Sequence, residues 1–226
     1  MNSRVPHVDA PLRRHTLVTL TAAGWGAAFA RDPALAADPL VRAWAARGWP
    51  LIVRRASPDE ADAGRVPLGL PLPPSAGKRR LALNVAADAL ATVGPLPALA
   101  DALAAAPDAW REPLRELDAL GTRCGVQGRV FGSLAWQALT GERYLGPSSD
   151  LDMVFPLPDA ASIAPLLDGI AAIDARAPIR IDGELLRGDG AGVNWRELHA
   201  RLPDVAVKTA IAVELMPADA FLRGAR

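Results

Sequence analysis

The stretch that decides the fold of this chain is Gly125–Phe155, GVQGRVFGSLAWQALTGERYLGPSSDLDMVF. Its pattern predicts a strand, a tight Gly-Ser turn, a helix, a loop and a second strand. The second predicted strand carries Asp150 and Asp152, separated by one apolar residue. Because side chains on a strand alternate between its faces, these two carboxylates point the same way, with their Cα atoms roughly 6.6 Å apart.

The Gly-Ser pair at Gly132 and Ser133 lies where the helix is expected to begin. A glycine lets the backbone turn sharply and come close to a ligand, and a helix N-terminus offers N–H groups to an anion. Paired carboxylates suit Mg²⁺, a hard cation that prefers oxygen ligands and phosphate oxygens, and Mn²⁺ suits the same donors. We therefore expect a metal-and-phosphate site, with Asp150 and Asp152 as metal ligands and Gly132 and Ser133 as substrate contacts.

A third carboxylate from a nearby strand commonly completes a site that displaces pyrophosphate with divalent metal. The segment Pro178–Leu185 alternates like a strand and its turn, and it supplies two carboxylates. Asp182 is the first candidate, as a catalytic residue, and Glu184 is the reserve.

The order of these elements resembles the nucleotidyltransferase superfamily: a Gly-Ser turn, a helix, an Asp-x-Asp strand and a later acidic strand. The gap between Ser133 and Asp150 is long for that superfamily. A closer resemblance accounts for the gap, because GSLAWQALTGERYLGPSSDLDM is similar to the segment characteristic of malonate decarboxylase holo-acyl-carrier-protein synthases, also called phosphoribosyl-dephospho-CoA transferases. The likeness covers most of the chain through RRHTLVTL, WPLIVRR, PLGLPLPP, KRRLAL, IDGELL, NWREL and VAVKT.

The resemblance implies a metal-dependent transferase. Enzymes of this family transfer 2′-(5″-phosphoribosyl)-3′-dephospho-CoA from its triphosphate precursor to a serine of the apo acyl-carrier subunit of malonate decarboxylase, and pyrophosphate leaves. Asp150 and Asp152 would be the metal-binding and catalytic carboxylates, Gly132 and Ser133 would contact the triphosphate, and Asp182 is hypothesised to be the base for the acceptor serine.

Basic residues must bind the rest of such a charged substrate. Arg54 and Arg55 end a predicted strand, and Lys208 lies inside an otherwise apolar one, so that its side chain either reaches outward or points into a site. These three, together with Lys78–Arg80, are our candidate substrate-binding cations.

Each of these interpretations has a structural alternative. Asp150 and Asp152 fit solvated carboxylates at a strand start, Ser133 fits a helix N-cap, and Asp182-Gly183 fits a turn. The arginine pair fits ordinary surface charge. At the level of function, the alternatives are a nucleotidyltransferase with another acceptor (a small molecule, a tRNA end or a protein hydroxyl) and an inactive scaffold that only binds.

Strands and helices mix in both halves of the chain, which indicates an α+β (mixed α/β) architecture. We expect two domains, a smaller N-terminal α/β domain over residues 1–87 and a nucleotidyltransferase-like catalytic domain over 88–226. The boundary is set near Ala87 because Ala-rich sequence, interpreted as mostly helical, begins there. Val66–Pro74 (VPLGLPLPP) is proline-rich and is predicted to be an extended loop or edge segment.

The bulk composition narrows the class of partner. Of the 226 residues, 25 are Lys or Arg and 25 are Asp or Glu, so the formal net charge is zero. That balance argues against a general nucleic-acid-binding protein. No long apolar run suggests a signal peptide or a membrane span, and a single cysteine excludes an internal disulfide. We expect a cytoplasmic enzyme without a membrane partner.

Overall fold

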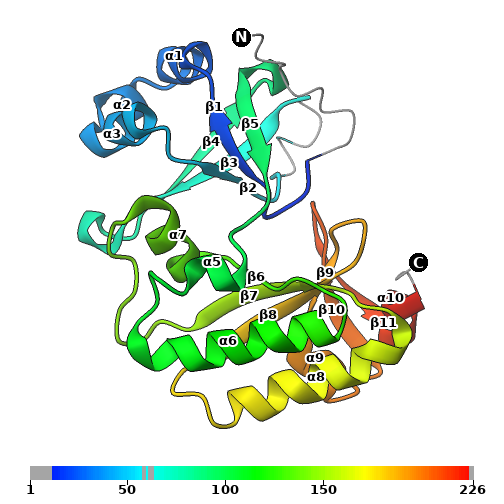
Figure 1. The fold of residues 1–226 in the computed structure, drawn as a ribbon. Coiled ribbons are helices and arrows are strands. Elements are labelled where there is room, and N and C mark those ends of the chain that lie inside the picture. Colours follow the sequence, from blue (N-terminus) through cyan, green and yellow to red (C-terminus); the bar gives the residue numbers. More distant parts are fainter. Residues whose placement is uncertain (1–11, 58–59, 61–63, 224–226) are drawn as a thin grey trace, which may run out of the picture. The chain divides into compact units, whose positions relative to one another are not determined.

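The computed structural model describes residues 12–57, 60 and 64–223, which form two compact units that divide between Pro95 and Leu96 (Figure 1). The outer limits of the expected domains, residues 1 and 226, lie outside the described residues. Each unit has its own sheet, and the predicted mixed α/β class is confirmed.

Unit 1 contains a five-stranded antiparallel sheet in the order β4-β3-β2-β1-β5, counted over its described residues. Its elements are β1 (Leu17–Leu20), α1 (Ala22–Arg31), α2 (Pro33–Ala37), α3 (Pro39–Arg47), β2 (Leu51–Val53), β3 (Val66–Pro71), the 3-10 turn η1 (Pro74–Ala76), β4 (Arg80–Val85), the 3-10 turn η2 (Ala87–Ala89) and β5 (Leu90–Gly94).

Helix α3 shows how local sequence sets the limits of an element. Asp38 is its N-cap and accepts a hydrogen bond from Leu40 N at 2.9 Å, and Pro39 takes the first helical position. Gly48 ends the helix in the left-handed conformation, with φ of 63°. Trp44 is buried on the inner side. All four features match the sequence pattern.

The proline-rich segment differs from expectation in one respect. It is extended, but β3 lies inside the sheet between β2 and β4, so its prediction as an edge was wrong. The carbonyl of Pro67 accepts from Arg54 N, so the backbone of this proline faces β2. Strand β2 is only three residues long, and the missing proline N–H therefore disrupts little of the ladder.

Strand β5 falls in sequence that was interpreted as mostly helical. It pairs antiparallel with β1, and the hydroxyls of Thr19 and Thr92 lie 2.7 Å apart across the pair. The β-branched residues Thr92 and Val93 favour a strand beside β1 over the helix that neighbouring alanines suggest. The first unit consequently continues through Pro95, beyond the expected limit at residue 87.

Unit 2 contains a six-stranded mixed sheet in the order β11-β10-β9-β8-β7-β6 over its described residues. Only β7 and β8 run parallel, and α8 connects them. Its elements are α5 (Leu99–Ala102), α6 (Asp108–Arg123), β6 (Arg129–Val130), α7 (Gly132–Thr140), β7 (Leu151–Pro156), α8 (Ala160–Asp174), β8 (Ile181–Leu186), β9 (Gly192–Asn194), α9 (Trp195–His199), β10 (Asp204–Lys208), β11 (Val213–Pro217) and α10 (Ala218–Arg223).

The two long helices α6 and α8 lie along one side of this sheet (Figure 1). Leu114, Leu117 and Leu120 of α6 are buried at helical spacing in the same core as Met153 and Phe155 of β7. This face of the sheet is closed by the core. The opposite face, which alternation assigns to Asp152 and Asp182, is the one on which a site can form.

The described part of the chain contains no helix that is long and apolar enough to cross a bilayer.

Candidate active site

Three carboxylates meet on the face of the second sheet that points away from α6 and α8. Asp150, Asp152 and Asp182 each offer one oxygen, and the three oxygens all lie within 4.8 Å of one another. The parallel register places Asp152 directly beside Asp182, and Asp150 precedes the first residue of β7. Since each side chain is only half-buried, the cluster is accessible to a ligand.

The same three residues fit a divalent cation by chemistry and by spacing. Three like charges brought this close repel one another, and a cation among them removes that repulsion. All donors are carboxylate oxygens, the set that Mg²⁺ and Mn²⁺ prefer over softer metals. Glu184, the alternative third carboxylate, is not in this cluster.

Helix α7 begins directly against the cluster. Gly132, its first residue, has φ of 61°, a conformation that side chains disfavour, and a Cβ there would overlap Asp152 Oδ2. The preceding amide, Phe131 N, donates to the carbonyl of Asp152 at 3.1 Å. The first turn of a helix has N–H groups without an intrahelical partner. In α7 this first turn begins at Gly132, beside Asp152. Glycine is thus required by close approach as well as by backbone conformation.

Ser133 is the second residue of α7. Phe131, whose side chain cannot accept a hydrogen bond, is the N-cap, so the interpretation of Ser133 as a helix cap is wrong. Asp182-Gly183 is not a turn either, because β8 continues through both residues to Leu186.

Asn194 is a neighbour of the cluster that sequence reasoning missed. Its Nδ2 donates to Asp182 Oδ1 at 2.8 Å, and its Oδ1 accepts from Arg196 N at 3.0 Å as the N-cap of α9. Because the cap occupies the amide oxygen, the amide nitrogen must face Asp182. The sequence signal was an asparagine just before a helix, in NWREL, which predicts a cap but not a contact across two strands.

Glu184 and Lys208 form an ion pair on the same side of the sheet. Glu184 is 5% exposed, and Lys208 Nζ lies 2.6 Å from its Oε1. The pair spans strand β9 at Gly192, where a Cβ would stand 2.8 Å from Glu184 Oε2. Gly192 therefore leaves the space through which the two side chains meet. Lys208, expected to bind substrate, has Glu184 as a direct partner.

The arginines proposed from the sequence lie in unit 1. Both terminal nitrogens of Arg54 contact Glu60, at 2.8 and 2.5 Å, and its Nε donates to the carbonyl of Leu68. The guanidinium lowers the pKa of Glu60 to about 2, chiefly through these hydrogen bonds. Arg55 is half-buried, and its Nε has no hydrogen-bond partner among the described residues. The contacts of Arg54 indicate a structural role within unit 1.

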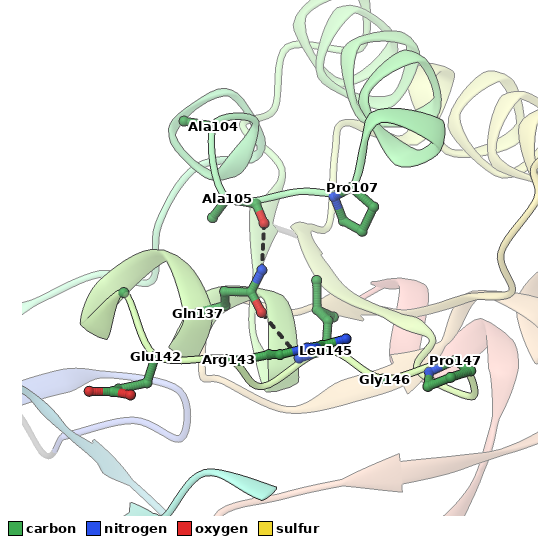
Figure 2. A pocket seen from close by; sticks show the side chains of 10 residues that line it. Ala104, Ala105, Pro107, Gln137, Glu142, Arg143, Leu145, Gly146 and Pro147 are labelled. Carbon is green, nitrogen blue, oxygen red and sulfur yellow. Dashed lines mark hydrogen bonds between the residues drawn. The ribbon is translucent and has the colours of Figure 1, made fainter. Parts of the chain in front are cut away.

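Gln137 ties the loop that leads from α7 to Asp150 to the segment that precedes α6. Gln137 Nε2 donates to the carbonyl of Ala105 at 2.7 Å, and Gln137 Oε1 accepts from Leu145 N at 3.2 Å (Figure 2). The same Oε1 accepts from Tyr144 N at 3.1 Å. A cavity of about 560 Å³ opens beside this bridge, lined mainly by small residues and by Glu142 and Arg143. The bridge anchors the loop at Tyr144 and at Leu145, which is five residues before Asp150.

Comparisons with known proteins match both units to one family. Residues 13–95 match the N-terminal domain, and residues 98–219 the C-terminal domain, of the family described as phosphoribosyl-dephospho-CoA transferase MdcG. A phosphoribosyl-dephospho-CoA transferase of Bradyrhizobium diazoefficiens is 46% identical over 225 residues, which cover 100% of this chain and 99% of the relative. One from Xanthomonas campestris pv. campestris is 40% identical over 213 residues, 92% of this chain and 95% of the relative.

A further relative of the same name, from Xanthomonas axonopodis pv. citri, is 35% identical over 205 residues, 90% of this chain and 93% of its own length. No solved structure matches the chain. The resemblance predicted from the motifs is confirmed, since both family domains are present in order and at full length. The chain belongs to the phosphoribosyl-dephospho-CoA transferase MdcG family.

Proposed function

We propose that this enzyme attaches the prosthetic group of malonate decarboxylase. It transfers 2′-(5″-phosphoribosyl)-3′-dephospho-CoA from 2′-(5″-triphosphoribosyl)-3′-dephospho-CoA to a serine hydroxyl of the apo acyl-carrier subunit. The observation that carries the proposal is the convergence of Asp150, Asp152 and Asp182 beside the start of α7, in a chain of this family.

The reaction forms one bond and breaks one. The serine oxygen of the carrier attacks the phosphorus nearest the ribose, a phosphodiester forms, and the bond to pyrophosphate breaks. Asp182 takes the serine proton, and the amide of Asn194 holds that carboxylate in orientation. The serine, the phosphorus and the leaving group must lie in line, so most of the catalysis is positioning and charge stabilisation.

Asp150 and Asp152 would hold Mg²⁺, with Mn²⁺ as a substitute. The bound cation would neutralise negative charge on the triphosphate. The first-turn N–H groups of α7, at Gly132 and Ser133, would contact phosphate oxygens that approach the cluster. Lys208 would add positive charge on the same face if Glu184 shares its ammonium group with substrate.

The test measures transfer directly. The protein is incubated with Mg²⁺, the triphosphate substrate and the apo carrier, and the carrier is weighed by mass spectrometry. We expect a gain of one phosphoribosyl-dephospho-CoA, and none with a carrier whose acceptor serine is replaced by alanine. No gain with the unaltered protein, or a gain that survives Asp150→Asn, would contradict the proposal.

Metal binding needs a separate measurement, because a loss of activity alone does not identify a ligand. Titration of the protein with Mn²⁺, followed by electron paramagnetic resonance, counts free and bound ion without any substrate. We expect saturable binding that Asp150→Asn and Asp152→Asn each abolish. Unchanged Mn²⁺ binding in both variants would place the metal elsewhere.

A further inference from the structure

The strand at one edge of the second sheet exposes an apolar strip that the site chemistry does not use. Ile211, Val213 and Leu215 are 66%, 53% and 75% exposed, and they are the three most exposed large apolar side chains among the described residues. Val213 and Leu215 alternate along β11, and Ile211 lies in the turn before it. Proteins usually protect an edge strand with charge or cover it, so such a strip marks a surface for contact.

The sheet register puts this strip on the same face as the carboxylate cluster. Lys208 is opposite both Val213 of β11 and Gly192 of β9, and residues opposite each other share a face. Gly192 shares that face with Asn194, which donates its hydrogen bond to Asp182. The face is therefore continuous from Asp182 to Val213. Three strand spacings separate β8 from β11, about 14 Å in all.

The opposite side of β11 contacts the core of unit 2. Met216 lies on that side, is half-buried and packs against this core, as does Leu222 of α10, whereas Glu214 on the same side is exposed. Core contact is therefore confined to one side of β11. The side without it faces the same direction as the carboxylate cluster.

Two reactants must reach this face, and their chemistry distinguishes them. The nucleotide carries phosphates, sugars and amide groups, which need charge or hydrogen-bonding partners, and an adenine ring, which binds in a concave site that encloses it. Three aliphatic side chains that are each more than half exposed at an edge strand provide none of these, whereas they match apolar side chains on a protein surface. Resting on the proposed function, we infer that Ile211, Val213 and Leu215 form the docking strip for the acceptor carrier protein, which binds there with its serine directed at Asp182.

The test changes the strip without changing the strand. Val213→Thr with Leu215→Thr removes apolar surface but keeps residues that favour strands. We expect the KM for the carrier to rise on the order of tenfold, with kcat at saturating carrier and KM for the nucleotide unchanged. The Kd for a carrier whose acceptor serine is replaced by alanine should rise in parallel. Leu202→Thr, at an exposed leucine outside β11, is the matched control and should change none of these values.

Several outcomes would overturn the inference. An unchanged KM and Kd for the carrier in the double variant would show that it docks elsewhere. A rise in the nucleotide KM alone would assign the strip to the nucleotide. A lower unfolding midpoint in the double variant would assign the strip to a contact within this chain, and a smaller mass in light scattering than that of the unaltered protein would assign it to a second copy.

The two proposals fail in different ways. If the proposed function is wrong, the unaltered protein adds no mass to the carrier. If only the docking strip is wrong, transfer proceeds and the double variant keeps the normal carrier KM. Because the alanine carrier cannot react, its Kd decides the docking question even where no transfer occurs.

Discussion

Two groups of carboxylates, one in each unit, have opposite surroundings. In unit 1, Glu60 and Asp38 each have a guanidinium within hydrogen-bond distance, from Arg54 and Arg79. In unit 2, Asp150, Asp152 and Asp182 converge on one another. Paired charges stabilise a fold modestly, whereas converging like charges destabilise it until a ligand arrives. This difference distinguishes charged side chains that stabilise the fold from those that bind a ligand or react.

Removing one charge of the cluster is the change that tests this comparison most strongly. We expect Asp152→Asn to lower the transfer rate about 10³-fold, because a metal ligand and a charge that positions substrate are lost together. When a chelator removes metal, the free energy of unfolding of the variant should equal that of the unaltered protein or exceed it by up to about 0.5 kcal/mol, because like-charge repulsion is relieved. Mass spectrometry of the carrier measures the transfer rate, and differential scanning calorimetry measures the stability.

Asp168→Asn is the control, because Asp168 is an exposed carboxylate on α8, and α8 covers the face of the sheet opposite the cluster. It should leave transfer unchanged. Destabilisation of Asp152→Asn by more than about 1 kcal/mol would mean that Asp152 is a structural charge like those of unit 1, and the contrast between the units would fail.

The second prediction concerns the glycine that brings α7 to the cluster. Gly132→Ala should lower transfer about 10²-fold and destabilise the protein by about 1–3 kcal/mol, because its Cβ overlaps Asp152 Oδ2 and its φ is positive. Gly141→Ala is a matched control at the other end of the same helix. Gly141 has φ of 74° and nothing within 4 Å of an added Cβ.

Gly141→Ala should therefore show the backbone cost alone, about 1 kcal/mol, with normal transfer. Equal loss of transfer in the two variants would mean that helix stability, and not the contact with Asp152, explains the effect.

Local patterns in the sequence were enough to predict the first part of the site. Gly132, Asp150 and Asp152 belong to one strand–helix–strand segment, in which alternation and turn chemistry decide the direction of each side chain. The caps of α3 were predictable for the same reason, since Asp38 and Gly48 act within one turn. Asp182 was predicted from its place on a strand-like segment, and its position beside Asp152 depends on pairing between β7 and β8.

The remaining features depend on pairing between segments that a sequence pattern does not specify. Strand β9 is three residues long, too short to show alternation, so neither Asn194 nor Gly192 could be placed against β8. The ion pair between Lys208 and Glu184 could be predicted only from the order of strands β8, β9 and β10 in the sheet. Strand β5 was missed because its pairing with β1 outweighs the helical tendency of the surrounding alanines.

The third prediction tests whether Asn194 acts on chemistry or only on the fold. Asn194→Ser keeps a residue that caps α9 but removes the amide that donates to Asp182, so transfer should fall about tenfold, with stability changed by less than about 1 kcal/mol. The Mg²⁺ concentration for half-maximal rate should rise with it. Asn194→Ala loses both the cap and the donor and should be less stable than the serine variant.

The difference in free energy of unfolding between Asn194→Ser and Asn194→Ala measures the contribution of the α9 cap. If serine restored transfer along with stability, the cap would account for the whole effect, and Asn194 would belong with the structural residues of the molecule.

The smallest expected effect lies in unit 1, where charge serves stability. Arg54 holds the pKa of Glu60 at about 2, below its ordinary value of 4.5. A carboxyl whose pKa is lowered by folding stabilises the protein above its ordinary pKa, and that contribution disappears as the pH falls from about 4.5 to 2. Glu60→Gln should therefore unfold about 1–2 kcal/mol more easily than the unaltered protein at pH 7. The gap between the two should close towards pH 2, as followed by denaturant titration.

Transfer by Glu60→Gln at pH 7 should remain within twofold of normal, because Arg54 and Glu60 act within unit 1 on its own loop and strand. The KM for the nucleotide is the informative measurement here. A marked change in that KM would mean that Arg54, once released from Glu60, alters substrate binding. Arg54 would then have the substrate-binding role predicted from the sequence, and the two units would not differ in the use of charge. An unchanged KM with a pH-dependent loss of stability would sharpen that difference, because a carboxylate would then stabilise the fold in unit 1 and take part in the reaction in unit 2.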